Sequence, residues 1–120
     1  MNARLSSLKA CPRVWGRVAG LSGAFAVALG AYAAHSHSIS PENKELVLSA
    51  NKYHFISSLA LLALSTSTNT HPLCGCLITV GTVMFCGSLY LKGFFDIPTM
   101  FIPPIGGVIM LFGWLSIAVL

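Results

Sequence analysis

The sequence predicts an all-α membrane protein with four transmembrane helices in an up-down bundle. Its 120 residues are 55% hydrophobic and 8% charged, whereas about a quarter of the residues of a soluble domain are charged. A soluble chain of this length could not bury so much apolar surface. Four apolar stretches are each long enough to cross the hydrocarbon core of a bilayer. We expect one domain at 14–120, preceded by a basic flank at 1–13.

The first predicted span covers residues 14–34, "VWGRVAGLSGAFAVALGAYAA". Small residues recur along one face of this helix in steps of three, four or seven. Because lipid gives no hydrophobic drive for helix association, membrane helices approach closely through small residues. We therefore predict a helix-packing face that contains Gly16, Gly20, Gly23 and Gly30.

The N-terminal flank is basic, and its charges allow two further interpretations. Arg4, Lys9, Arg13 and Arg17 precede any acidic residue, the first of which is Glu42. A basic start, an apolar core and small residues also describe a secretory signal peptide, and a basic, serine-containing start resembles a mitochondrial transit sequence. The glycine face favours retention of the first helix, because a signal peptide needs no packing face.

The second span is predicted at 46–64, within a helix that begins near Pro41. Ser40, Pro41 and Glu42 have the pattern of an N-cap, a first-turn proline and an acid that the helix dipole favours. The uncharged segment "STSTNTHP" then forms a turn.

The third and fourth spans are predicted at 73–91 and 104–120. The prolines of "KGFFDIPTMFIPP" separate them, and Tyr90 is expected at the membrane interface. Further packing positions are predicted at Gly106, Gly107 and Gly113. The distribution of lysine and arginine predicts both termini on the inner side, meaning cytoplasm or mitochondrial matrix.

Polar residues interrupt the second span in the string "NKYHFISS". Asn51, His54 and Ser58 fall on one helical ridge, and Lys52 lies on the neighbouring one. We treat the four as an intramembrane polar cluster near the membrane entrance of the helix. Intramembrane ionisable groups are candidates for a proton or ion path. Polar contacts between helices, with Lys52 reaching the headgroups, are the interpretation that we prefer.

Metal and catalytic chemistry have little support in the sequence. His35 and His37 form a candidate loop site, but no third ligand follows at suitable spacing. The four cysteines suggest neither a disulfide framework nor a zinc site. A triad of His54, Ser88 and Asp96 lacks a nucleophile elbow. We expect no enzymatic activity, no metal and no cofactor.

Four strings in series resemble one family of small four-helix membrane proteins, called transmembrane protein 256 or domain of unknown function 423. They are "GAFAVALGAYAAH", "ANKYHFISSLALL", "MFCGSLYL" and "PPIGGVIMLFGWL". The resemblance covers residues 14–120 and implies no established enzymatic activity. It places the family's histidine on His35, its helix-entry motif on Asn51 and His54, and its glycine pair on Gly106 and Gly107. This chain has "AAHSHS" where the family usually has Gly-Ala-His-Gly.

The resemblance also implies a mitochondrial location for animal members and an inner-membrane location for bacterial ones. We therefore predict a structural protein in the lipid bilayer of the mitochondrial inner membrane, with both termini on the matrix side. Its expected role is that of an accessory or assembly component of a larger respiratory-chain complex. The alternatives are another membrane, and a small proton- or metabolite-coupled carrier that uses Asn51, Lys52 and His54.

Overall fold

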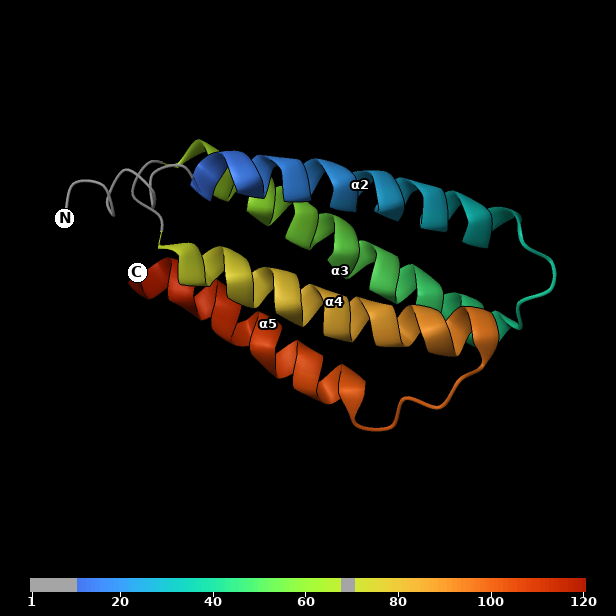
Figure 1. The fold of residues 1–120 in the computed structure, drawn as a ribbon. Coiled ribbons are helices and arrows are strands. Elements are labelled where there is room, and N and C mark those ends of the chain that lie inside the picture. The colour runs from blue at the N-terminus through green and yellow to red at the C-terminus, as the bar shows by residue number, and fades with distance from the viewer. Residues whose placement is uncertain (1–10, 68–70) are drawn as a thin grey trace.

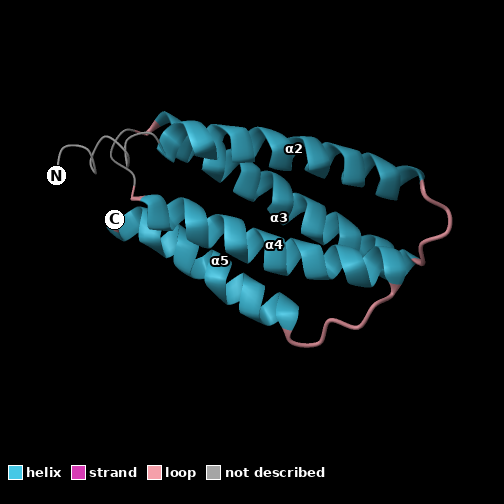
Figure 2. Cartoon of the chain, in the orientation of Figure 1, coloured by secondary structure: helices cyan, strands magenta, loops and turns pink. Residues whose placement is uncertain are grey.

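The structure is a computed structural model that describes residues 11–67 and 71–120. Those residues form the helices α2 (Cys11–His35), α3 (Pro41–Thr66), α4 (Pro72–Phe95) and α5 (Ile102–Val119), joined by loops. No strand occurs in the described part of the chain (Figure 2). All four helices are long and apolar enough to cross a membrane. The predicted fold class, a four-helix membrane protein, is confirmed. Residues 1–10 of the basic flank, with Arg4 and Lys9, lie outside the described residues.

Successive helices run in opposite directions, as Figure 1 shows. They pack in chain order, α2 on α3, α3 on α4 and α4 on α5. The start of α2 and the end of α5 therefore lie at one end of the bundle, and the connections 36–40 and 96–101 lie at the other. The inner helix α4 is the most buried, while α2 and α5 form the two outer edges.

The ends of α3 and α4 follow from local chemistry. The Ser40 hydroxyl accepts a hydrogen bond from the Asn43 amide at 3.2 Å, with Pro41 in the first turn, which confirms the predicted helix start. At α4, the His71 ring accepts from the amide of Leu73 at 3.1 Å. Asp96 ends this helix in the left-handed conformation, with φ 57°. The helix thus continues for one turn past the expected span end at residue 91.

The contact between α2 and α3 depends on alanine more than on glycine. Ala19, Ala26 and Ala33 are buried and recur every seven residues, so they form one continuous seam. The packing role predicted for Gly20 and Gly23 is wrong, because a Cβ atom at either position would meet nothing within 4 Å. Gly20 is one residue past Ala19, which turns it about 100° away from the seam.

The other two glycines predicted in α2 do lie at contacts with α3. An added Cβ at Gly16 would be 3.4 Å from Cβ of Ser65, which is ordinary contact. An added Cβ at Gly30 would be 2.7 Å from Oδ1 of Asn51, which is too close. Only Gly30 is therefore needed as glycine for the approach of α3.

The contact between α4 and α5 does depend on glycine. A Cβ at Gly106 would collide with the backbone amide of Phe85, and one at Gly113 would lie 2.8 Å from Ile78. On the facing helix, a Cβ at Gly81 would lie 2.5 Å from the Met110 backbone nitrogen. Gly107 differs, because its nearest neighbour would be a Phe85 ring carbon at a comfortable 3.6 Å. Gly106 and Gly113 therefore carry the close packing, and Gly107 does not.

Candidate functional site

The Asn51 side chain joins three helices in the interior of the bundle. Its amide nitrogen donates to the main-chain oxygen of Ala26 on α2 at 2.6 Å. The same nitrogen donates to the hydroxyl oxygen of Tyr90 on α4 at 3.2 Å. Because a main-chain oxygen can only accept, the first bond fixes the orientation of the amide. Asn51 therefore uses both of its donor hydrogens between helices.

His54 lies one turn further along α3 and contacts the same tyrosine. Its Nδ1 is 3.0 Å from the Tyr90 hydroxyl oxygen, and the two rings meet edge to face with centroids 5.8 Å apart. Since that oxygen already accepts from Asn51, its own hydrogen is free to bond Nδ1 of His54. In the neutral ring the remaining hydrogen is then on Nε2. This assignment is consistent with the bonds that join Asn51, Tyr90 and His54.

Ser58 completes the polar ridge. Its hydroxyl is 2.6 Å from that of Ser22 on α2, and it donates to the main-chain oxygen of His54 at 2.8 Å. On the opposite flank, the Cys86 thiol donates to the main-chain oxygen of Ala50 at 3.3 Å. The predicted ridge of Asn51, His54 and Ser58 thus contacts both α2 and α4, so it faces the protein rather than lipid.

The polar cluster lies at the middle of its helix. His54 is about 20 Å of helix rise from Pro41 and about 18 Å from Thr66, so it lies at the middle of α3. The expected place near the membrane entrance stays a prediction, because a position along a helix does not by itself fix a depth in the bilayer.

Lys52 does not belong to this cluster. Its side chain is exposed and lines a shallow surface hollow with Glu42, Glu45 and Ser49. A step of one residue along a helix turns a side chain by about 100°, which takes Lys52 away from Asn51. The predicted four-residue cluster is therefore corrected to Asn51, His54 and Ser58, with Tyr90 as the added member.

The loop histidines lie apart from the cluster. His35 ends α2 and His37 follows in the connection to α3, and both are exposed. Within residues 11–67 and 71–120, no three His, Cys, Asp or Glu residues are close enough to hold a metal ion.

The triad considered from the sequence is not assembled. The Ser88 hydroxyl donates to the main-chain oxygen of Phe85 at 2.9 Å. Asp96 instead binds Lys92 at 3.2 Å and Asn43 at 3.5 Å. It follows the last residue of α4, at one end of the bundle, whereas His54 lies at the middle of α3. The ammonium group of Lys92 and its hydrogen bond, followed by the bond from Asn43, hold the pKa of Asp96 below its usual value.

Tyr90 is the member of the polar cluster that sequence reasoning missed. It is 9% exposed and bonds to Asn51 and His54 of α3, so its hydroxyl contacts protein, and its expected interfacial depth stays a prediction. One signal could have found it: Cys86, Tyr90 and Gly93 share a face of α4 at steps of four and three. All three are buried, and a Cβ at Gly93 would collide with Val47 of α3.

The sequence of this four-helix protein matches a known protein family. A family model described as "Protein of unknown function (DUF423)" matches residues 29–107, which include Asn51, His54 and Tyr90. The chain belongs to the DUF423 family. All four strings that carry the resemblance overlap the matched range, although the first begins ahead of it and the fourth runs past its end.

The relatives of this DUF423 protein include several bacterial membrane proteins. A "UPF0382 membrane protein" of Haemophilus influenzae is 35% identical over 105 residues, which cover 82% of this chain and 85% of the relative. Another, of Staphylococcus saprophyticus, is 34% identical and covers 82% and 88%. A third, of Staphylococcus aureus, is 32% identical and covers 82% and 87%. No solved structure matches the chain. These relatives agree with the assignment as an integral membrane protein.

Proposed function

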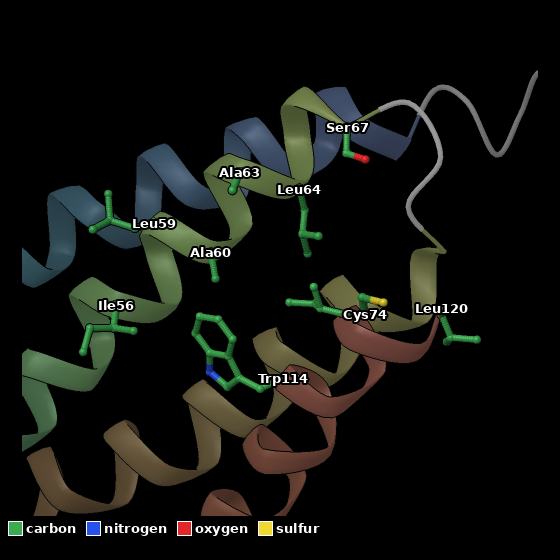
Figure 3. A pocket seen from close by; sticks show the side chains of 10 residues that line it. Ile56, Leu59, Ala60, Ala63, Leu64, Ser67, Cys74, Trp114 and Leu120 are labelled. Atoms are coloured by element: carbon green, nitrogen blue, oxygen red, sulfur yellow. The ribbon is translucent and has the colours of Figure 1, made fainter.

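We propose that this DUF423 protein is a structural membrane protein, and that it acts as an accessory or assembly component of a larger membrane complex. The main support is a groove between α3 and α5 with a volume of about 660 Å³. Figure 3 shows Trp114 of α5 across from Ile56 and Ala60 of α3, with Ala63 further along α3. Apart from Ser67, the lining side chains are apolar.

The occupant that we propose for the groove is an apolar transmembrane helix of the larger complex. The small side chains of Ala60 and Ala63 let another helix approach the α3 backbone closely, as membrane helices do at their contacts. Trp114 is 43% exposed and supplies a large apolar wall. Ile117 of α5 and Leu120, which follows this helix, also line the groove and are 38% and 56% exposed.

The internal polar groups give less support to a carrier. Asn51, His54 and Tyr90 bond to each other and to Ala26, and Lys52 lies outside the cluster. A carrier would need ionisable groups that line a path to both sides of the membrane. We likewise propose that the protein is not an enzyme, since Ser88 and Asp96 are each bonded away from His54.

We propose the mitochondrial inner membrane and a respiratory-chain complex as the setting, with both termini in the matrix. The support is the basic N-terminal side, which within the described residues includes the exposed Arg13 and Arg17. Protease protection of a C-terminal tag in intact and osmotically opened mitochondria tests this orientation. Digestion of the tag after the outer membrane alone is opened would contradict it.

Blue-native electrophoresis of solubilised membranes tests the structural role. The wild-type protein is expected to migrate with a larger complex, and Ala63→Trp, which fills the groove, is expected to release it. Ala24→Trp is the matched control, because Ala24 is exposed on α2 and does not line the groove. Migration of the wild-type protein only as a free monomer would contradict the proposal.

A further inference from the structure

A second cavity lies on the other side of the bundle, where α2 and α4 flank α3. Its volume is about 380 Å³, which is within the size range of small-molecule sites. The lining comes from three helices, with Ser22 from α2, His54 from α3, and Thr82, Gly87 and Tyr90 from α4 among its members. The cavity therefore reaches the polar cluster from the side.

The mouth of the cavity faces the bilayer. Leu21 and Phe25 of α2 line it and are 67% and 64% exposed, and Val83 of α4 lines it and is 66% exposed. These apolar rims lie in the central part of membrane-spanning helices. A guest would thus enter sideways from lipid, with most of its body apolar.

The inner wall of the cavity offers hydrogen-bond donors. His54 lines the cavity, and its Nδ1 is already bonded to the Tyr90 hydroxyl. That bond leaves the hydrogen on Nε2, for which the described residues provide no hydrogen-bond acceptor. His54 therefore presents one free N–H donor to a guest.

Two threonines on the same wall also lack partners. Thr79 and Thr82 line the cavity, and within the described part of the chain their hydroxyl oxygens are buried without a hydrogen bond. Thr82 is 6% exposed. A buried hydroxyl without a partner destabilises the folded protein. An acceptor atom on a guest would supply the missing partner, so the polar end of the guest would lie against these threonines.

We propose that this cavity binds a lipid-soluble molecule that presents a carbonyl oxygen to His54 and Thr82 and leaves its apolar body toward Leu21, Phe25 and Val83. Two kinds of membrane molecule share this chemistry, the acyl esters and the quinones. The site is separate from the groove between α3 and α5, so it does not depend on the proposed assembly role.

Gly87 supplies a variant that blocks the cavity without disturbing the fold. Gly87 lines the cavity, and an added Cβ there would meet nothing within 4 Å. Gly87→Leu therefore places a side chain in empty space and improves helix propensity. Gly20→Leu is the matched control, because Gly20 also has nothing within 4 Å but lies outside the cavity lining.

The test measures binding to the full chain purified in dodecyl maltoside. Three probes of similar apolar size are titrated: decyl-benzoquinone, a monoacylglycerol and decylbenzene, which has no carbonyl group. Either carbonyl probe, or both, should raise the unfolding midpoint of the wild type and of Gly20→Leu, and decylbenzene should not. Which carbonyl probe binds identifies the source. Affinity should fall at least tenfold in Gly87→Leu.

Thr82→Val separates binding from a structural role. Since the substitution removes an unpartnered buried hydroxyl, the empty protein should become more stable, while affinity for the carbonyl probe should fall roughly threefold to tenfold. Equal binding of decylbenzene, unchanged affinity in Gly87→Leu, or no binding of any probe to the wild type would each overturn the proposal.

Discussion

The Asn51 amide donates to the main-chain oxygen of Ala26 at 2.6 Å, directly beside Gly30. In the α2 helix, the same oxygen is the ladder partner of the Gly30 amide, four residues later. Asn51 thus uses the second lone pair of an oxygen that is already bonded, and the bare Cα of Gly30 gives its side chain the room. These three residues act as one contact between α2 and α3.

Loss of the Asn51 amide should weaken the bundle. Asn51→Ala removes the bonds to Ala26 and Tyr90 and should lower the free energy of unfolding by about 0.6–1.7 kcal/mol, the range found for polar contacts between membrane helices. Unfolding with SDS in mixed micelles, followed by circular dichroism, measures it. The control is Ser49→Ala, an exposed position on the same helix that should change stability by less than about 0.5 kcal/mol.

Gly30 should tolerate a methyl group only when Asn51 is absent. The added Cβ of Gly30→Ala would lie 2.7 Å from Oδ1 of Asn51, so the amide must move and its bond to Ala26 must weaken. We expect a loss of about 1 kcal/mol or more for such overpacking. Gly20→Ala, which meets open space, should be neutral or stabilising. An equal cost of Gly30→Ala in the Asn51→Ala background would contradict this explanation.

Adjacent glycines on α5 should respond in opposite directions. Gly106→Ala drives a Cβ into the Phe85 backbone and should cost about 1–3 kcal/mol. Gly107→Ala makes only ordinary contact with the Phe85 ring, and its better helix propensity should add up to about 1 kcal/mol. The same SDS titration compares them. Similar effects of the two substitutions would show that α5 does not pack on α4 in this register.

Asp96 should make the stability of the protein depend on pH, but only at acidic pH. Lys92 lowers the folded-state pKa of Asp96 below the reference value of 3.8. The group therefore binds its proton more readily in the unfolded chain, so its contribution is fully present above about pH 5 and is lost as pH falls below about 4. Asp96→Asn, which still tolerates φ 57°, should remove this acid-dependent step. Because Asp96 is exposed, added salt should shrink it.

The sequence predicts the helices well because their signals are local. Apolar length gives four spans, and Ser40 followed by Pro41 gives the start of α3. The ridge of Asn51, His54 and Ser58 also follows from helical periodicity alone. These features need no knowledge of which helix packs against which.

Positions that depend on a neighbouring helix are harder to predict. Gly20 and Gly30 look alike in sequence, yet only Gly30 has a side chain of α3 above it. Tyr90 near the expected end of a span resembles an interfacial residue until the rotation of α4 places it against Asn51. The seven-residue repeat that includes Ala26 is visible in the sequence, but alanine and glycine are both small, so the sequence alone does not show which of the two contacts α3.

We infer that Asn51 and Tyr90 hold three helices together through one shared network, and a double-mutant cycle measures the coupling between them. The unfolding free energies of the wild type, Asn51→Ala, Tyr90→Phe and the double variant are measured by SDS titration. We predict a coupling energy of about 0.6 kcal/mol or more, because both substitutions remove the same 3.2 Å bond. Additive effects of the two substitutions, within about 0.3 kcal/mol, would contradict it.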